Sequence, residues 1–299
     1  MKQLSHLSSE QLSNWILEAS QQAKKGKLPD YIPLLKQTDA SLLTVCIVTK
    51  NNNILIQGDS QISFSLMSII KPFLLLYLLS ELGEKIIFQK VGSKPSNYPF
   101  NSLEQLQLDQ GFPRNPMINS GALTLASLLP GKDANKRYKN LQQWLNKLSQ
   151  CHLFLDELML KSVQSVPNPR NQAIIDELIK RNHIKDPEIT LDTYNKICCL
   201  SGTITDLAKL GLLLVDSPNI NQQNSSIVTN IMNTCGLYEA SENFAKKIVF
   251  PSKSGVSGAI LSIVPKQGAI ACYSPPLDQQ GNSIASLYII EKIANYLNC

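Results

Sequence analysis

Two strand-rich regions lie near opposite ends of this chain, and a long helical stretch separates them. Residues 41–50 and 54–57 are rich in β-branched and aliphatic side chains, and an Asn-Asn-Asn turn at 51–53 joins them, which predicts a β-hairpin. Residues 248–250, 259–264 and 269–273 have the same character near the other end. Strands so far apart pair only if the chain folds back on itself, so we expect both ends to build one antiparallel sheet.

The middle of the chain, residues 68–240, consists of apolar periodic segments broken by prolines and by Gly83, which indicates helices. Two further helices are expected, one from the capping-box pair Ser8 and Gln11 to about Lys24, and one over residues 283–297. The predicted fold class is α+β, with the helical subdomain against one side of the sheet. The sequence shows neither repeats nor a linker, so we expect residues 1–299 to form a single domain.

Composition and charge exclude several classes of protein. Hydrophobic residues make up 43% of the chain and charged residues 17%, which excludes a disordered chain and a coiled coil. The net charge is only +5, and the basic clusters at 24–27 and 136–139 lack the density and aromatic residues of a nucleic-acid-binding face. The longest apolar run, residues 69–82, is interrupted by Lys71 and Pro72 and is too short to cross a membrane.

Cysteine and histidine usage indicates the compartment and argues against a metal site. The seven cysteines show no C-x-x-C spacing, and no secretory leader follows Met1, so we expect a cytoplasmic protein whose cysteines are mostly buried and reduced. The three histidines are far apart in the sequence, so no metal site is expected.

The first candidate for chemistry is the S-x-x-K motif formed by Ser68 and Lys71 at the start of the most apolar predicted helix. Positions i and i+3 share a helix face, so the Lys71 amine can reach the Ser68 hydroxyl. If burial lowers the pKa of that amine, it can act as a base and activate the serine as a nucleophile. The alternative is an exposed serine beside an ordinary lysine, since S-x-x-K often occurs by chance.

The second candidate is the Lys253-Ser254-Gly255 triplet, which precedes a predicted strand. A Lys-Ser/Thr-Gly triplet is the third element of the signature of penicillin-binding proteins and β-lactamases, where this strand lines the active site. The alternative is a glycine-rich turn between two strands. The triplet follows the S-x-x-K motif in the order of that signature, with a helical insertion between them. The active-site strand and the glycine-rich turn are therefore about equally favoured.

Longer blocks of sequence decide between these alternatives. Residues 113–122 (P-R-N-P-M-I-N-S-G-A), 253–259 (K-S-G-V-S-G-A) and 274–283 (S-P-P-L-D-Q-Q-G-N-S) resemble blocks of the serine-dependent glutaminases, and so do residues 26–33 and 92–96. This is the family of the bacterial glutaminases and of the kidney- and liver-type catalytic domains. The resemblance covers essentially the whole chain, in order and with matching spacing.

The resemblance implies a reaction, a fold and a set of site residues. The reaction is the hydrolysis of L-glutamine to L-glutamate and ammonia without a cofactor or metal, and the fold is β-lactamase/transpeptidase-like. Ser68 is then the nucleophile and Lys71 the general base, and the backbone N–H groups of Ser68 and Val256 form the oxyanion hole. The remaining positions that match the family's catalytic and substrate-binding residues are Tyr31, Asn119, Asn171, Tyr194 and Tyr238. The resemblance also implies a homodimer or homotetramer.

Two positions depart from the family pattern. Met67 replaces the glutamine that usually precedes the nucleophile, and Gln164 stands where the family has a glutamate that binds the substrate ammonium. Because Gln164 lacks the negative charge, we expect a weak glutaminase or an altered substrate preference. Two alternatives therefore stay open: a hydrolase of the same fold that acts on another amide or a β-lactam, and a lapsed homologue that only binds an amino acid.

Overall fold

The computed structural model describes residues 2–297, so Cys299 lies outside the described residues. Five antiparallel strands form the main sheet in the order β2 (Ile54–Gln57), β1 (Thr44–Thr49), β8 (Gly268–Tyr273), β7 (Ala259–Val264) and β6 (Ser252–Ser254). Strands β1 and β8, from opposite ends of the chain, pair along their full length, which confirms the single sheet expected from the sequence.

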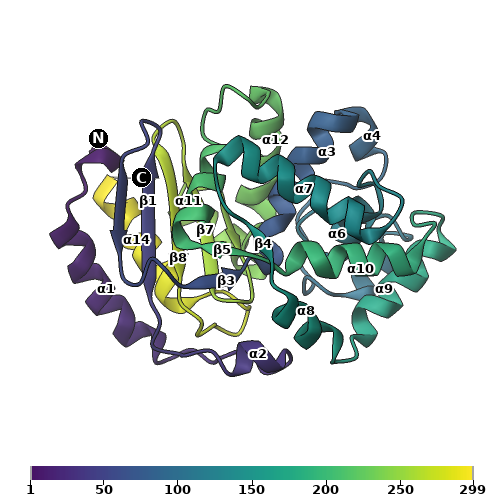
Figure 1. Cartoon of the computed structure of the whole chain (residues 1–299), viewed down its shortest axis with the longest axis horizontal. Coiled ribbons are helices and arrows are strands. Elements are labelled where there is room, and N and C mark those ends of the chain that lie inside the picture. The colour runs from purple at the N-terminus through teal and green to yellow at the C-terminus, as the bar shows by residue number, and fades with distance from the viewer. Residues whose placement is uncertain (1, 298–299) are drawn as a thin grey trace.

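Both faces of this sheet are covered by helices, because successive residues of a strand point to opposite sides. The pair Ile47 and Ile270 faces α1 (Ser9–Ala23) and α14 (Ile284–Leu297), whereas the neighbouring pair Cys46 and Ala271 belongs to the core shared with the helical region. Figure 1 shows α1 and α14 on the outer side of the sheet and the helical region on the other side. The capping box of α1, formed by Ser8 and Gln11, is present as predicted.

The helical region begins with α3 (Ile70–Leu82), which is apolar all round and is therefore a buried core helix. The helix α11 (Ile204–Leu212) packs directly on strands β1, β7 and β8. The remaining α-helices are α2 (Pro33–Lys36), α4 (Glu84–Phe88), α5 (Leu103–Leu108), α6 (Asn119–Ser127), α7 (Ala134–Ser149), α8 (Glu157–Gln164), α9 (Pro169–Lys180), α10 (Pro187–Cys198), α12 (Gln222–Cys235) and α13 (Ser241–Lys247).

Two features of the fold differ from the sequence-based expectation. A second sheet of three short strands, β3 (Ser63–Ser65), β5 (Leu200–Thr203) and β4 (Phe154–Leu155), was not expected, and its strands β4 and β5 lie within the region expected to be helical. The strand predicted at 248–250 is wrong: these residues follow α13 as irregular chain. Ile248 and Phe250 are buried and Val249 is exposed, which is the alternation of burial typical of a strand. Hydrogen bonding to β7 nevertheless begins only at the Pro251 carbonyl, which accepts from the N–H of Ile263.

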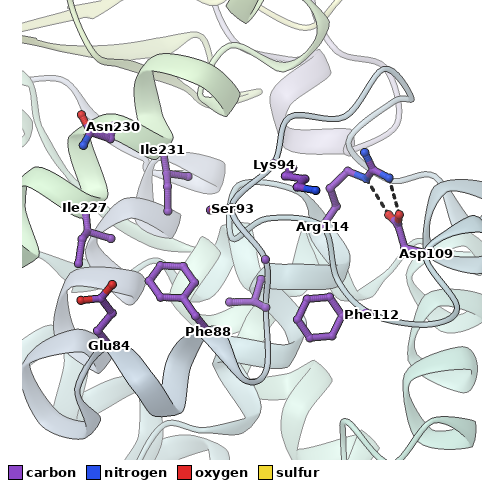
Figure 2. Close-up of a pocket in the computed structure, with 12 residues that line it drawn as sticks. Glu84, Phe88, Ser93, Lys94, Asp109, Phe112, Arg114, Ile227, Asn230 and Ile231 are labelled. Carbon is purple, nitrogen blue, oxygen red and sulfur yellow. Dashed lines mark hydrogen bonds and ion pairs between the residues drawn. The ribbon is translucent and has the colours of Figure 1, made fainter.

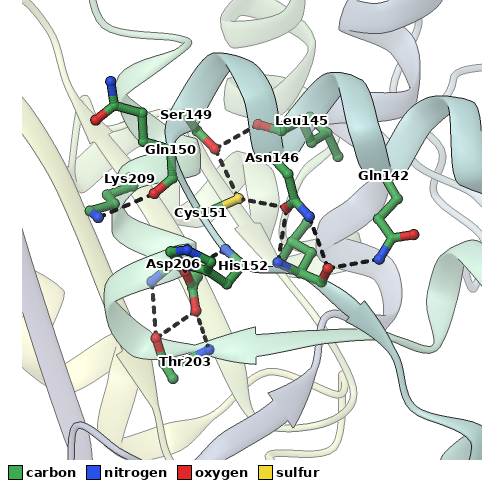
Figure 3. Close-up of polar contacts among 11 residues, drawn as sticks. Gln142, Leu145, Asn146, Ser149, Gln150, Cys151, His152, Thr203, Asp206 and Lys209 are labelled. Atoms are coloured by element: carbon green, nitrogen blue, oxygen red, sulfur yellow. Dashed lines mark hydrogen bonds and ion pairs between the residues drawn. The ribbon is translucent and has the colours of Figure 1, made fainter.

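A buried carboxylate joins the second sheet to the helices (Figure 3). Asp206, in the first turn of α11, accepts hydrogen bonds from the N–H and hydroxyl of Thr203 at 2.9 and 2.7 Å. It also accepts the N–H of His152 at 2.9 Å, from the segment that follows α7. Asp206 therefore fixes the start of α11 relative to β4 and β5, and the Thr203 hydroxyl caps that helix.

Two further features of the described residues concern the cysteines and the apolar helices. All six described cysteines are free and buried. No helix between residues 2 and 297 combines the length and the apolar character that crossing a membrane requires.

Candidate active site

Ser68 lies where the second sheet passes into the first helix of the helical region. After β3 the chain makes a single 3-10 turn, η2 (Met67–Ile69), and continues directly as α3. Met67 adopts the left-handed conformation with φ of 47°, which is uncommon for a side chain other than glycine. This strained residue turns the chain so that Ser68, which is 7% exposed, stands at the start of α3.

Lys71 is completely buried one helical turn further on. Its amine donates to the carbonyl oxygen of Met117 at 3.2 Å and to Oδ1 of Asn119 at 2.8 Å. Burial lowers the pKa of Lys71 to about 8, while the nearby Cys198 thiol acts in the opposite direction. A neutral amine has two N–H donors and one lone pair, so these two acceptors use both donors and leave the lone pair free to accept a proton.

Asn119 connects three helices at the centre of the site. It is the first residue of α6, and its Oδ1 accepts both from Lys71 and from the Tyr194 hydroxyl of α10, at 3.1 Å. Its Nδ2 donates to Oδ1 of Asn171, on α9, at 2.9 Å. The amide nitrogen of Asn119 thus faces Asn171, and its oxygen faces Lys71 and Tyr194. Because an amide oxygen only accepts, both Lys71 and Tyr194 donate to it.

Tyr238 lies within hydrogen-bond distance of Ser68. It also has a left-handed backbone, with φ of 56°, and its hydroxyl donates to the Ser254 carbonyl at 3.2 Å. Burial raises the pKa of Tyr238 to about 12, and a hydrogen bond with Ser68 partly opposes this effect. A second buried lysine, Lys253, lies 4.3 Å from the centre of the Tyr238 ring. Its amine donates to the carbonyls of Gly236 and Ser254 at 2.9 and 2.7 Å, and burial lowers its pKa well below the usual value.

The turn that joins β6 to β7 packs against the segment that contains Ser68. A Cβ added at Gly255 would lie 2.7 Å from the Leu66 carbonyl oxygen and 3.2 Å from the Ile69 side chain, so only glycine fits there. Val256 follows directly and is 8% exposed. Gly255, the residue before Val256, therefore packs against Leu66 and Ile69, which lie on either side of Ser68 in the chain.

Two predicted substrate residues lie at the edge of the site. Tyr31 is 51% exposed and lies between an isolated antiparallel bridge, formed by Lys27 and Leu277, and α2. Its phenol lies near that of Tyr238. Gln164 is an exposed residue at the end of α8. Its Nε2 lies 3.5 Å from Oδ1 of Asp192. A carboxylate therefore lies next to Gln164, although Gln164 itself lacks the negative charge of the family's glutamate.

Three groups of the site carried no signal in the sequence. The Met117 carbonyl is a backbone atom, which residue identity does not reveal. Phe100 lies with its ring centre 4.7 Å from that of Tyr238 and 6.0 Å from the Lys71 amine. Cys198, one helical turn after Tyr194, forms a hydrogen bond with the Tyr194 hydroxyl and has a pKa raised to about 11 by burial.

Comparison with known proteins identifies the family. The family model described as glutaminase matches residues 26–299. The chain belongs to the glutaminase family. A glutaminase of Synechocystis is 45% identical over 293 residues, covering 97% of this chain and 90% of that protein. Glutaminase 2 of Escherichia coli K12 is 35% identical over 283 residues and covers 91% of each chain.

Solved structures of glutaminases share the fold. A probable glutaminase from Bacillus subtilis, complexed with 6-diazo-5-oxo-L-norleucine, has a TM-score of 0.89 at 28% identity, covering 100% of this chain and 97% of that one. The glutaminase chain therefore has the β-lactamase-like α+β fold, and its class is that of a hydrolase acting on an amide.

Proposed function

We propose that this glutaminase hydrolyses the side-chain amide of L-glutamine through an acyl-enzyme on Ser68. The observation that carries the proposal is the buried amine of Lys71, three residues after Ser68, with both of its N–H donors engaged and its pKa lowered to about 8. A lysine in this state accepts a proton near neutral pH without a metal.

The first half of the reaction forms the acyl-enzyme. Lys71 takes the hydroxyl proton as Ser68 Oγ attacks the amide carbon, and the resulting oxyanion is stabilised by the N–H groups of Ser68 and Val256. The bond from carbon to nitrogen then breaks, and the nitrogen leaves as ammonia with the proton held by Lys71. Tyr194 and Tyr238 relay this proton, since Tyr194 shares the acceptor Asn119 with Lys71 and Tyr238 contacts Ser68.

The second half releases glutamate. A water molecule attacks the ester carbonyl and gives its proton to the same amine, and the bond to Ser68 Oγ breaks as that oxygen recovers the proton. The polar groups of Tyr31, Asn119, Gln164 and Asn171 bind the α-amino and α-carboxylate groups of the substrate. A small zwitterion requires such fixed polar groups at both ends.

Ammonia release from a panel of amides tests the proposal. We expect release from L-glutamine and much less from L-asparagine and D-glutamine, and none from the Ser68→Ala variant. 6-diazo-5-oxo-L-norleucine, with which the Bacillus subtilis protein was complexed, is expected to label Ser68 covalently in the wild type. A folded wild-type chain that neither releases ammonia nor reacts with this compound would instead support a lapsed homologue that binds an amino acid.

We further propose a homodimer or homotetramer in the cytoplasm. The free state of the six described cysteines supports a reducing compartment, and family membership supports self-association. Light scattering of the purified chain measures the assembly directly, and a monomer at micromolar concentration would contradict this part of the proposal.

A further inference from the structure

A cavity of about 710 Å³ lies next to the segment that positions Lys71, between α4, α12 and the loop that precedes α6 (Figure 2). This volume is within the range of about 300–1,000 Å³ that small-molecule sites occupy. Its floor is apolar and is formed by Phe88, Val91, Phe112, Ile227 and Ile231. Such a floor fits an aromatic ring or a branched aliphatic chain.

One end of the cavity carries an excess of positive charge, because Lys94 and Arg114 share the single carboxylate of Asp109 there. Asp109 accepts from Nε and Nη2 of Arg114 and from the side chain of Gln105, and the hydrogen bond from Arg114 is the main cause of its lowered pKa. The charge of Arg114 is thus compensated. Among residues 2–297, no acceptor or carboxylate is bonded to the exposed Lys94 amine, which lies beside Arg114 in Figure 2. Lys94, Arg114 and Asp109 together leave one positive charge at this end.

The opposite end would repel an acidic group. Glu84 lies there with Asn230, and its carboxylate accepts from Gln223 at 2.9 Å. We propose that the cavity is a regulatory site for a small amphipathic organic acid, with a single carboxylate at Lys94 and an aromatic or branched aliphatic body over the apolar floor.

Hydrogen bonds connect this cavity to the general base. The Lys94 N–H donates to the Arg114 carbonyl at 3.2 Å, and the Lys94 carbonyl accepts from Nδ2 of Asn115 at 2.9 Å. Asn115 Oδ1 in turn accepts the N–H of Met117 at 2.9 Å, and the Met117 carbonyl is one of the two acceptors of Lys71. A ligand that moves Lys94 therefore changes the position of one of the two acceptors that hold the Lys71 amine.

Titration calorimetry with 3-phenylpropionate tests the site, and 3-phenylpropan-1-ol is the neutral comparison. We expect the acid to bind one site per chain and the alcohol to bind more weakly. Lys94→Met should weaken binding of the acid about ten-fold and remove the preference over the alcohol. Lys85→Met removes the same charge from α4 outside the cavity lining and should change nothing. Ile227→Trp fills the cavity and should abolish binding of both compounds.

The regulatory role is tested separately by the pH profile of kcat/KM for glutamine. A saturating concentration of the acid should shift its midpoint in the wild type and not in Lys94→Met. Equal binding of acid and alcohol, or binding that survives Ile227→Trp, overturns the site. Binding without a shifted midpoint overturns the regulatory role, and an altered oligomeric state of Ile227→Trp identifies the cavity as an interface between copies. Calorimetry on Ser68→Ala keeps these results independent of the proposed hydrolysis.

Discussion

The most direct perturbation of the proposed base is Asn119→Asp, which places a carboxylate where the amide oxygen now lies, 2.8 Å from the Lys71 amine. Two unit charges at 2.8 Å attract by about 6 kcal/mol at an effective dielectric constant of about 20. At about 1.4 kcal/mol per pKa unit, this attraction corresponds to about four units in favour of the charged amine. Side-chain relaxation and water entry reduce the effect, and we expect the pKa of Lys71 to rise by about two units.

The assay is kcat/KM for L-glutamine between pH 6 and about pH 11, in the wild type and in the variant. Only the neutral amine accepts a proton, so kcat/KM of the wild type should rise with pH and reach half its plateau near pH 8, where Lys71 titrates. With a pKa of about 10, only about 1% of the amine is neutral at pH 8, so the variant should lose about fifty-fold in rate there and recover at higher pH.

The position of the midpoint, and not the height of the profile, is the test, because Asn119 also belongs to the proposed substrate site. Asn171→Asp is the matched control, since Asn171 is one hydrogen bond further from the amine and still accepts from Asn119. It should shift the midpoint much less. If the two Asn→Asp variants and the wild type share one midpoint, Lys71 is not the group that titrates in the rate profile.

Three further predictions follow from individual contacts. Gln164→Glu should lower KM for glutamine by about ten-fold or less, because the position is exposed and faces Asp192. The control is Gln172→Glu, at an exposed position of α9, which should leave KM unchanged. Equal effects of the two substitutions on KM would contradict the role of Gln164. Gly255→Ala should reduce kcat about ten- to hundred-fold in steady-state assays, because the added Cβ would lie 2.7 Å from a backbone oxygen and displace the Val256 N–H; unchanged kcat would refute this account of the turn. Asp206→Ala should lower the free energy of unfolding in urea by about 2–4 kcal/mol through the loss of three hydrogen bonds, with KM preserved; a loss below about 0.5 kcal/mol would show that the network is dispensable.

Much of the fold could be predicted from the sequence, because the elements concerned are long or have strong end signals. Ser8 and Gln11 form the capping box at the start of α1, and the hairpin of β1 and β2 joins at the expected Asn turn. The short strands β3, β4 and β5 were missed because segments of two to four residues are too short to show a periodicity. Residues 248–250 were misassigned because a short run of β-branched and aromatic residues can be buried without a partner strand.

The candidate site also has a part that the sequence predicts and a part that only the tertiary structure shows. The sequence alone determined the motifs and hence the family, and it identified Ser68 and Lys71 as neighbours, because a helix fixes the relation between positions three residues apart. Only the tertiary structure decided the surroundings of the lysine. The Met117 carbonyl and Asn119 lie 46 and 48 residues away in the chain, yet they saturate the donors of the Lys71 amine. Burial lowers the pKa of that amine, and both the burial and its backbone acceptor arise from packing between distant segments.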